Sequence, residues 1–484
     1  MKRFAKIVCT LGPSSSDEQT IRKLIEAGMN VARLNFSHGT HESHAKLIST
    51  IRKLSDEMKT PVAILQDLQG PKLRVGNLPD EGICLKPGMI VNLYAIEGGE
   101  PKKIDGEVSL PLDVPNLARA VKKGNRILLD DGRLELQVND VQGENVVTSV
   151  VLGGTLTSHK GVNLPGADLK IPIPTEKDKD DLKFGLAQGV DFVALSFVHS
   201  AAEINTLRDL INQYQPDKKG PGIIAKLERP EAIENLHEIM HATDGVMVAR
   251  GDLGIETSPS YVPIVQKQII HMANRHAKIV ITATQMLESM IHNPRPTRAE
   301  ASDVANAILD GTDAVMLSGE TASGSYPIES VQMMSSIVCE AEAHMEEWGH
   351  AVDFPKDALQ DDAIAMTRAA RELAHDRKVA ATAVLTQTGR TALLMSKARP
   401  RVEIMAFTPN KNVFNLMSMY WGVTAMMIPF VDSLEGVVQT VDTVLQKDHR
   451  FKKGEQIIVI TGFPLPALHL PNLALLHNIG EKVQ

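Results

Sequence analysis

Residues 222–252 read GIIAKLERPEAIENLHEIMHATDGVMVARGD, and the fold can be predicted from this stretch outward. Two apolar runs, GIIAKLE at 222–228 and GVMVARGD at 245–252, flank an amphipathic segment that contains EAIENLHEIM. Near-continuous apolar strands that alternate with helices are typical of a parallel sheet covered on both faces. The stretch therefore predicts one strand–helix–strand unit of an α/β protein.

The same unit recurs along the chain. Amphipathic stretches follow most of the other apolar runs, which lie at 5–12, 31–37, 61–67, 190–198, 278–284 and 314–320. Together with the first two runs, these predict a (β/α)8 TIM barrel.

One long segment interrupts the alternation. Residues 71–169 are rich in Gly, Pro and Val and contain short alternating runs such as RLELQVNDV, which predict a small all-β lid domain inserted in a barrel loop. The catalytic barrel would then comprise 1–70 and 170–345, close to the size of about 250 residues that is typical of the fold. Residues 346–484 predict a separate three-layer α/β regulatory domain, with strands at 379–386, 401–408, 423–429 and 455–462.

The composition excludes several classes of protein. Hydrophobic residues make up 43% and charged residues 23%, an ordinary globular balance, and a net charge of −8 argues against nucleic acid as a partner. The three cysteines show no CxxC spacing, which fits a reducing cytoplasm and argues against a structural zinc site. We find no run of 18 apolar residues and only a short apolar stretch near the N-terminus, so neither a membrane span nor a signal peptide is expected.

Polar side chains gather at the carboxyl ends of the predicted strands, where the active sites of TIM barrels lie. A single charge at a strand end is usually a solvated tip or a helix cap, but its recurrence at the same end of several strands indicates a site. A lysine inside an apolar strand is rarely buried without a partner, so Lys226 should pair with Glu228 or bind an anion. The full set is Arg33, Asn35, Ser37, Asp67, Lys226, Glu228, Arg250, Asp252, Thr284, Ser318 and Glu320.

The residue types in this set indicate chemistry on phosphate. Glu228 and Asp252 offer hard oxygen ligands from adjacent strands, which suit Mg²⁺ or Mn²⁺. Arg33, Arg74 and Lys226 supply charges that bind anions. A divalent cation with several basic groups indicates phosphoryl transfer or a phosphorylated acid as substrate. No GxxxxGK[ST] motif occurs, so a nucleotide would be held in another way.

Six segments closely resemble sequence blocks of the pyruvate kinase family. They are RLNFSHG at 33–39, KGVNLPG at 160–166, IIAKLERPEAI at 223–233, MVARGDLGIE at 247–256, ATQMLESM at 283–290 and LSGETASGSYP at 317–327. The resemblance runs from residue 6 to about 345, and the C-terminal part is similar in layout. It implies a cytoplasmic, homotetrameric, allosteric phosphotransferase of glycolysis that converts phosphoenolpyruvate and ADP to pyruvate and ATP.

The resemblance also implies roles for single residues. Glu228 and Asp252 would hold Mg²⁺, with Mn²⁺ as a substitute, and Lys226 and Arg33 would contact the transferred phosphoryl group. The backbone amides of Gly251 and Asp252 and the Thr284 hydroxyl would orient the substrate carboxylate. The proton route to the enolate would involve Thr284, Ser318 and Glu320.

The nucleotide phosphates would be lined by Asn35, His38, Arg74 and Lys160. The inserted domain would close over them, with Asp131 pairing to Arg33 and excluding water. Two of these residues could instead have a purely structural role. His38 could cap a helix start, and Asp131 could be a hairpin-turn residue, since DDG is a strong turn signal.

Residues 70–74 read GPKLR, whereas K⁺-dependent relatives carry a glutamate in place of the lysine, as in GPEIR. Asn35, Ser37 and Asp67 match the positions that bind K⁺ in those relatives. A lysine ammonium is itself a compact monovalent cation, so Lys72 beside Asp67 could replace the ion, and we expect activity without K⁺. The alternative is that Lys72 faces solvent and K⁺ binds elsewhere.

The segment TQTGRT at 386–391 is similar in position to an effector site of the family. Thr386, Thr388, Arg390 and Thr391 would contact a sugar phosphate or a nucleotide monophosphate at a helix N-terminus, although the segment could also be an ordinary helix start. The loop TGFPLPALHLPN at 461–472 lacks the glycine- and threonine-rich pattern of many relatives, which leaves the effector unidentified.

Two other functions would share parts of this pattern. Another Mg²⁺-dependent barrel enzyme acting on phosphoenolpyruvate or pyruvate, such as a mutase or a carbon–carbon lyase, would need no nucleotide lid, so Lys160 and Asp131 argue against it. A non-catalytic metabolite sensor would be expected to have lost Lys226, Glu228 or Asp252, and all three are present.

Overall fold

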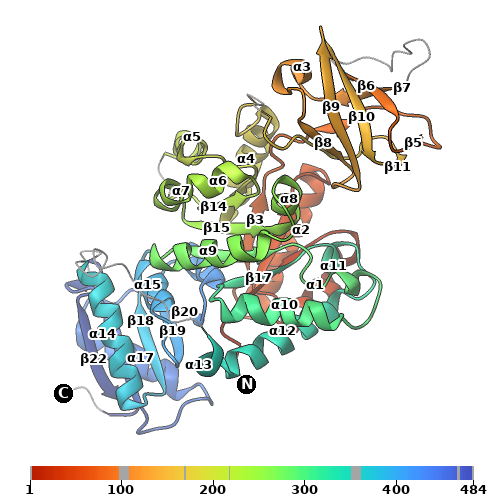
Figure 1. Cartoon of the computed structure of the whole chain (residues 1–484). Coiled ribbons are helices and arrows are strands. Elements are labelled where there is room, and N and C mark those ends of the chain that lie inside the picture. The colour runs from red at the N-terminus through yellow and green to blue at the C-terminus, as the bar shows by residue number, and fades with distance from the viewer. Residues whose placement is uncertain are drawn as a thin grey trace.

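A computed structural model describes residues 3–96, 108–167, 171–216, 219–349, 361–465 and 469–481. Figure 1 shows three parts, with the barrel in the middle, the inserted domain at one end of it and the C-terminal domain at the other. The predicted fold class is therefore confirmed: a (β/α)8 barrel, a separate region made mostly of sheet and a C-terminal α/β domain. Within the described residues, no helix is both long enough and apolar enough to cross a membrane.

Eight parallel strands close the barrel in the order β1-β17-β16-β15-β14-β13-β3-β2. Every predicted strand is present, but most are shorter than predicted because the polar residues at their ends belong to loops. The strands are β1 (Lys6–Thr10), β2 (Val31–Asn35), β3 (Ala63–Asp67), β13 (Phe192–Leu195), β14 (Gly222–Leu227), β15 (Gly245–Ala249), β16 (Ile279–Ala283) and β17 (Ala314–Leu317).

Alternate residues of each strand face opposite sides of the barrel wall. On β14, Ile224 packs in the barrel interior, whereas Ile223 and Ala225 pack against the surrounding helices. The same period of two directs Lys226 inward at the carboxyl end of the strand. Both faces are apolar, and this explains why the strands read as continuous hydrophobic runs.

Helices cover the outside of the barrel (Figure 1). Several begin with a capping box, in which a Thr or Ser side chain binds the backbone of the first turn, as Thr40, Thr175, Ser200 and Thr297 do. The helices are α1 (Glu18–Ala27), α2 (His41–Glu57), α4 (Glu176–Gln188), α5 (Ala201–Tyr214), α6 (Pro230–Glu234), α7 (Leu236–Ala242), α8 (Arg250–Glu256), α9 (Val262–Arg275), α10 (Arg298–Leu309), α11 (Gly319–Ala322), α12 (Pro327–Ala343) and α13 (Met345–Trp348). Two 3₁₀ turns, η1 (Pro13–Ser15) and η2 (Glu288–Ile291), complete this part.

The inserted domain has its own apolar core, which includes Leu93, Leu110 and Leu136. Its main sheet has the order β12-β8-β9-β10-β6-β7-β4, and β11 pairs with β5. It is not purely β as predicted, because α3 (Leu117–Ala120) forms a short helix. The strands are β4 (Arg74–Val75), β5 (Ile83–Leu85), β6 (Ile90–Ala95), β7 (Val108–Asp113), β8 (Arg126–Leu129), β9 (Leu134–Gln142), β10 (Asn145–Leu152), β11 (Gly154–Leu156) and β12 (Val162–Asn163).

The C-terminal domain is a five-stranded sheet of order β20-β19-β18-β21-β22. Helices α14, α15 and α16 pack on one face, and α17 packs on the other. Four of the strands match the prediction, whereas the antiparallel edge strand β22 was not predicted. The elements are α14 (Asp362–Arg377), β18 (Ala381–Leu385), α15 (Arg390–Ala398), β19 (Glu403–Thr408), α16 (Lys411–Leu416), η4 (Met417–Met419), β20 (Val423–Met427), α17 (Leu434–Gln446), β21 (Gln456–Thr461) and β22 (Leu473–Asn478).

Buried polar contacts join this domain to the barrel. The Lys397 ammonium of α15 binds the carboxylate of Asp313, just before β17, and Arg399 donates to the same carboxylate at 2.8 Å. The Lys6 ammonium at the start of β1 donates to the Val423 carbonyl at 2.8 Å. These contacts lie at the amino ends of the barrel strands, so the carboxyl ends stay free to face the inserted domain.

Candidate active site

A buried cluster of charges lies at the carboxyl ends of β2, β3 and β14. Asp67 is 1% exposed, and its carboxylate accepts a hydrogen bond of 2.7 Å from the Arg33 guanidinium and lies 3.3 Å from the Lys226 ammonium. Burial pushes the pKa of Asp67 upward, but Lys226 and Arg33 outweigh it and hold the pKa below its usual value. Arg33 is fixed further by a 2.9 Å hydrogen bond to the Thr10 hydroxyl.

The Lys226 ammonium contacts three oxygens. Besides Asp67, it donates to the Ser196 hydroxyl at 2.7 Å and lies 2.9 Å from the Glu228 carboxylate. Burial alone would lower the pKa of Lys226, but Asp67 and Glu228 raise it above the usual lysine value. The ammonium is therefore charged and held in one place at the top of the barrel interior.

Glu228 and Asp252 form the predicted pair of carboxylates. Glu228 is 1% exposed and accepts a 2.7 Å hydrogen bond from the Phe197 backbone amide. Asp252, in the first turn of α8, makes no hydrogen bond or ion pair with any other residue that the structure describes. Burial, and then the charge of Glu228, raise the pKa of Asp252 above its usual range.

This arrangement fits a divalent cation. A partly buried carboxylate without a cationic partner, next to a second carboxylate, is destabilised in its charged form. Mg²⁺ and Mn²⁺ would compensate both charges and accept carboxylate oxygens as ligands. The Asp252 carboxylate, which has no ion-pair partner among the described residues, is thus the structural reason to regard the pair as a metal site.

The turn after β16 is held in a strained conformation beside α8. Thr284 and Gln285 have φ angles of 65° and 54°, in the left-handed region that disfavours side chains with a Cβ. The Thr284 hydroxyl accepts a 2.8 Å hydrogen bond from the Gly251 backbone amide. The Arg250 guanidinium donates to the Thr284 carbonyl at 2.7 Å and pairs with Asp303 at 2.6 Å, so Arg250 fixes this turn.

Ser318 and Glu320 lie behind this turn. The Glu320 carboxylate is fully buried and accepts hydrogen bonds from the Leu287 and Ser318 backbone amides at 3.1 and 2.7 Å. Burial raises its pKa. The Ser318 hydroxyl is buried and has no hydrogen-bond partner among the described residues. Both residues are therefore close to the Thr284 turn, and their role in proton transfer stays a prediction.

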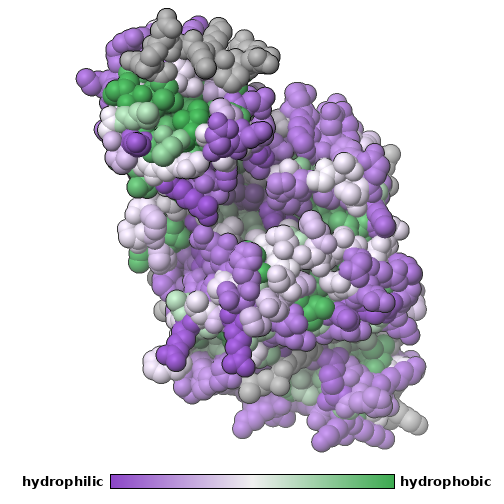
Figure 2. Space-filling view, turned by 90° about the vertical axis from the view of Figure 1, so that its right-hand side faces the viewer, coloured by the Kyte–Doolittle hydropathy of each residue, from purple (hydrophilic) through white to green (hydrophobic). Residues whose placement is uncertain are grey.

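A cleft separates this cluster from the inserted domain, and Figure 2 shows a recess beneath that domain. Asp131 and Asp252 both line two adjoining cavities of about 520 and 780 Å³, and Lys72 lines the first of them. Asp131 sits in the turn between β8 and β9 with a φ of 56°, so it is a hairpin-turn residue and also faces the cleft. Arg33 binds Asp67 and Thr10 here, and the ion pair between Arg33 and Asp131 that is predicted for the closed domain stays a prediction.

The residues predicted to line the nucleotide lie in two places, Asn35 and His38 at the end of β2 and Arg74 and Lys160 side by side in the inserted domain. His38 is exposed after β2, and it does not cap α2, because Thr40 occupies the N-cap position. Arg74 donates to the His159 carbonyl at 2.8 Å, and Lys160 pairs with Asp130 at 2.8 Å. The Asn35 side-chain oxygen accepts a 3.1 Å hydrogen bond from the Ser37 amide.

Lys72 was predicted to lie beside Asp67, and the structure does not place it there. Arg33 and Lys226 already occupy the carboxylate of Asp67, and Lys72 makes no hydrogen bond or ion pair with the part of the chain that the structure describes. Burial, and then the charge of Arg74, lower the pKa of Lys72, whereas Asp131 and Asp252 act in the opposite direction. The ammonium therefore faces the cleft near those two carboxylates.

The predicted effector residues lie at the start of α15. Thr386, Thr388 and Thr391 line a small cavity of about 60 Å³, whereas the exposed Arg390 is not part of its lining. Gly389, with a φ of 85°, precedes the helix, and its amide donates to the Thr386 hydroxyl at 2.9 Å. The loop at 461–472 is described only in part, because residues 466–468 lie outside the described residues.

Sequence reasoning missed three groups that orient the site. They are the hydroxyls of Thr10 and Ser196 and the backbone amide of Phe197. The predicted strand at 190–198 concealed the last two, because β13 ends at Leu195 and the polar loop begins at Ser196. The sequence did offer one signal for the end of this strand, because Ser196 is a polar residue near the end of an apolar run.

Comparisons with known proteins identify the family of the chain. The family model described as pyruvate kinase, barrel domain, matches residues 2–331, and the pyruvate kinase alpha/beta domain model matches residues 362–475. A pyruvate kinase of Mycobacterium tuberculosis is 41% identical over 483 residues, covering 99% of both chains. Pyruvate kinases of Geobacillus stearothermophilus and Staphylococcus aureus are each 42% identical over 485 residues, covering 99% of this chain and 81% of theirs. The chain therefore belongs to the pyruvate kinase family and is an enzyme of that type.

Proposed function

We propose that this enzyme transfers the phosphoryl group of phosphoenolpyruvate to ADP at a site where Glu228 and Asp252 hold Mg²⁺. The bond between phosphorus and the enol oxygen breaks, a bond forms to a terminal phosphate oxygen of ADP, and the enolate takes up a proton to give pyruvate. The observation that carries the proposal is the carboxylate of Asp252 beside Glu228, which burial and the Glu228 charge destabilise and which has no ion-pair partner among the described residues.

The fixed cations stabilise the charge of the phosphoryl group in flight. Lys226 is held by three oxygens before any substrate arrives, so its ammonium needs no reorganisation during the reaction. Arg33 supplies a second cation from the same cluster. Mg²⁺, or Mn²⁺ in its place, would add Lewis-acid stabilisation of the phosphate and carboxylate oxygens.

The strained turn after β16 would hold the other end of the substrate. The Thr284 hydroxyl and the Gly251 and Asp252 amides would bind the carboxylate of phosphoenolpyruvate, and the hydrogen bond between Gly251 and Thr284 keeps these groups together beforehand. The enolate would be protonated through water near Thr284, with Ser318 and Glu320 behind it.

The inserted domain would supply the nucleotide side of the site. Asn35, His38, Arg74 and Lys160 would contact the phosphates of ADP. Closure would bring Asp131 toward Arg33 and exclude water from the phosphoryl group. The open cleft lined by Asp131 and Asp252 supports this proposal, because it leaves room for the movement.

We further propose that the enzyme needs no K⁺. Lys72 places a built-in positive charge in the cleft and lacks an ionic partner among the described residues. Its charge would act on the side of Asp131 and Asp252 rather than directly on Asp67. A free monovalent cation would be repelled from the same position.

Regulation and assembly remain predictions. Thr386, Thr388, Arg390 and Thr391 would bind a sugar phosphate or a nucleotide monophosphate, and the cavity at three of these residues supports that location. A homotetramer, a cytoplasmic location and a place in glycolysis are proposed on the strength of the family.

The test is pyruvate release from phosphoenolpyruvate and ADP with Mg²⁺, first in K⁺-free buffer and then with K⁺ added. Fast turnover without K⁺ is the expected result. Turnover only with K⁺ would refute the role of Lys72 and leave the reaction standing. Silence in both buffers, even after titration with sugar phosphates and nucleotide monophosphates, would refute the proposed reaction.

A further inference from the structure

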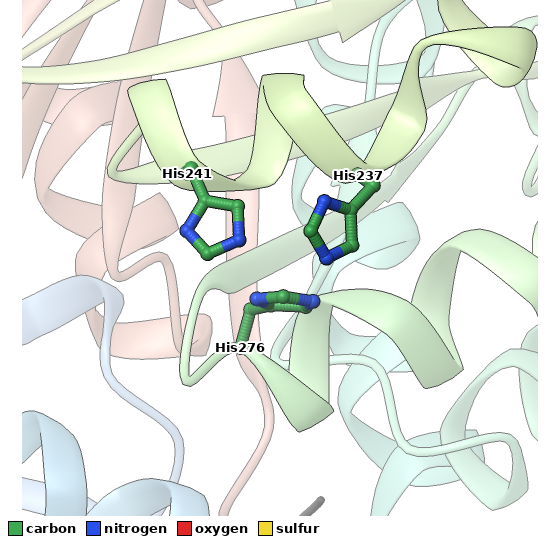
Figure 3. Close-up of side chains that lie close together, drawn as sticks. All are labelled: His237, His241 and His276. Atoms are coloured by element: carbon green, nitrogen blue, oxygen red, sulfur yellow. The ribbon is translucent and has the colours of Figure 1, made fainter. Parts of the chain in front are cut away.

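Three histidines meet on the outside of the barrel. His237 and His241 are one helical turn apart on α7, and His276 caps the end of α9 (Figure 3). One ring nitrogen from each residue lies within 4.8 Å of those of the other two. The ring centroids are separated by 4.7 to 5.2 Å, and the His276 ring stands nearly perpendicular to the other two, at 86° and 81°.

The three imidazoles are held near one another without any bond between them. None of the rings makes a hydrogen bond or an ion pair with a residue that the structure describes. Their backbone positions are nevertheless fixed, because Ile239 and Met240 of α7 and Ala273 of α9 are fully buried. A rigid scaffold thus presents three ring nitrogens that no protein group uses.

The surroundings of His276 disfavour its protonated form. Burial, and then His241 and His237, lower the pKa of His276 to about 4, and Lys278 and Arg275 act in the same direction. The neutral imidazole is the form that donates a lone pair to a metal.

We propose that His237, His241 and His276 bind one divalent transition-metal ion, such as Zn²⁺, Co²⁺ or Ni²⁺. Three imidazole nitrogens with water in the remaining position form a common tetrahedral set for Zn²⁺. A metal–nitrogen bond of about 2.0–2.1 Å requires nitrogens roughly 3.3 Å apart in that geometry. The nitrogens lie within 4.8 Å of one another, so metal binding would require the exposed side chains of His237 and His241 to rotate and close that spacing.

The ligand types separate this site from the Mg²⁺ site. Imidazole suits Zn²⁺, Ni²⁺ and Co²⁺, whereas Mg²⁺ prefers oxygen ligands. Excess Mg²⁺ would therefore fill Glu228 and Asp252 and leave the histidines free. The cysteine spacing argues against a structural zinc site built from cysteines. It does not argue against this site, because its three ligands are all histidines.

The site is not that of a peptidase, although residues 237–241 read HEIMH and match the H-E-x-x-H pattern of zinc peptidases. In those enzymes the glutamate is the general base beside the metal. Here the Glu238 carboxylate accepts a 3.2 Å hydrogen bond from the Ala201 amide at the start of α5. None of the described cavities has these histidines in its lining.

The position of the site indicates a structural effect. The chain passes from α7 into β15 and from α9 into β16, so a metal would join the two helix ends that precede these strands. Those ends lie at the amino ends of the strands, away from Glu228 and Asp252. Bound metal should therefore stabilise the barrel and leave basal turnover unchanged.

The test is equilibrium dialysis of the full-length protein against Zn²⁺ or Ni²⁺ in excess Mg²⁺, together with thermal unfolding. His237→Ala and His276→Ala remove ligands, and His271→Ala removes an exposed histidine of the same helix α9 that lies outside the cluster. Unfolding in metal-free buffer checks that each variant folds.

Wild type and His271→Ala should bind one metal ion that the two cluster variants bind at least about tenfold more weakly. Zn²⁺ should raise the unfolding temperature of wild type and His271→Ala, and should leave that of His237→Ala and His276→Ala unchanged. Equal binding by all four proteins would overturn the proposal, and would instead indicate another ligand such as the exposed thiol of Cys84.

Discussion

The two sides of the barrel mouth differ in how they balance charge. On the side of β2, β3 and β14, Asp67 is neutralised by Arg33 and Lys226 within the protein. On the side of α8 and the inserted domain, Asp252 and Asp131 make no ion pair with any described residue. The first side is complete before ligands bind, whereas the carboxylates of the second side have no ion-pair partner within the described residues, and Lys72 is the nearby cation that faces them.

This difference separates two tasks of the site. The paired side holds Lys226 and Arg33 in fixed positions, and such preorganisation is the main source of electrostatic catalysis. The unpaired side leaves carboxylates available to a divalent cation and to the closing domain. Variants on the two sides should therefore behave differently, and the following predictions start from the largest expected effect.

Lys226→Met should lower kcat by a factor of about 10²–10³, the usual result of losing one preorganised group that stabilises the transition state. The reason is that the charge next to the phosphoryl group is lost and Asp67 keeps only Arg33. Steady-state assays with saturating substrates measure the change. Lys183→Met, at an exposed lysine of α4, is the matched control, and equal activity of the two variants would contradict the role of Lys226.

Asp67→Asn should lower the free energy of unfolding by about 3–5 kcal/mol, because it leaves two buried cations without their shared partner. Asp252→Asn is the matched variant on the unpaired side. In metal-free buffer, the free energy of unfolding of Asp252→Asn should be equal to or higher than that of wild type, since the variant removes a carboxylate that has no ion-pair partner among the described residues. Urea unfolding of both variants measures the contrast, and equal losses would show that the two sides do not differ.

Lys72→Glu should reduce turnover in K⁺-free buffer about tenfold, equivalent to about 1.4 kcal/mol, because it reverses a charge in the cleft. Added K⁺ should restore part of the activity. Lys72→Met removes the charge without reversing it and should lie between wild type and Lys72→Glu. Full activity of Lys72→Glu without K⁺ would exclude Lys72 as the built-in cation.

Asp131→Asn should have the smallest effect, a rise in the KM for ADP of up to about fivefold, since an ion pair formed at an exposed cleft contributes at most about 1 kcal/mol. Stability should not change, because Asp131 makes no ion pair in the open cleft. Kinetics with varied ADP measure the effect. A wild-type KM with a large loss of stability would mean that Asp131 is only a turn residue.

The barrel could be predicted because its strands are apolar on both faces and stand out as continuous runs. The edge strand β22 (LALLHN) escaped prediction because it pairs antiparallel, directly with β21, and the described residues between the two strands form no α-helix. The helix α3 escaped because its single turn is too short to show periodicity.

Residue types and strand ends sufficed to predict the carboxylate pair and the cations of the site. The partner of each charge could not be predicted, because it depends on side chains from strands far apart in sequence. Arg33 donates to one oxygen of Asp67 and the Lys226 ammonium lies 3.3 Å from the other, whereas Lys72 lines the cleft beside Asp131 and Asp252. The Ser196 hydroxyl and the Phe197 amide escaped notice because the end of β13 was misplaced.

The central claim is that Asp252 and Glu228 hold the catalytic metal ion on the unpaired side. The most direct test is the rate of pyruvate formation from phosphoenolpyruvate and ADP as Mg²⁺ is titrated, in wild type and in Asp252→Asn. The account predicts that turnover depends on Mg²⁺ and that the variant needs at least about tenfold more of the ion. An unchanged Mg²⁺ dependence in Asp252→Asn would contradict it.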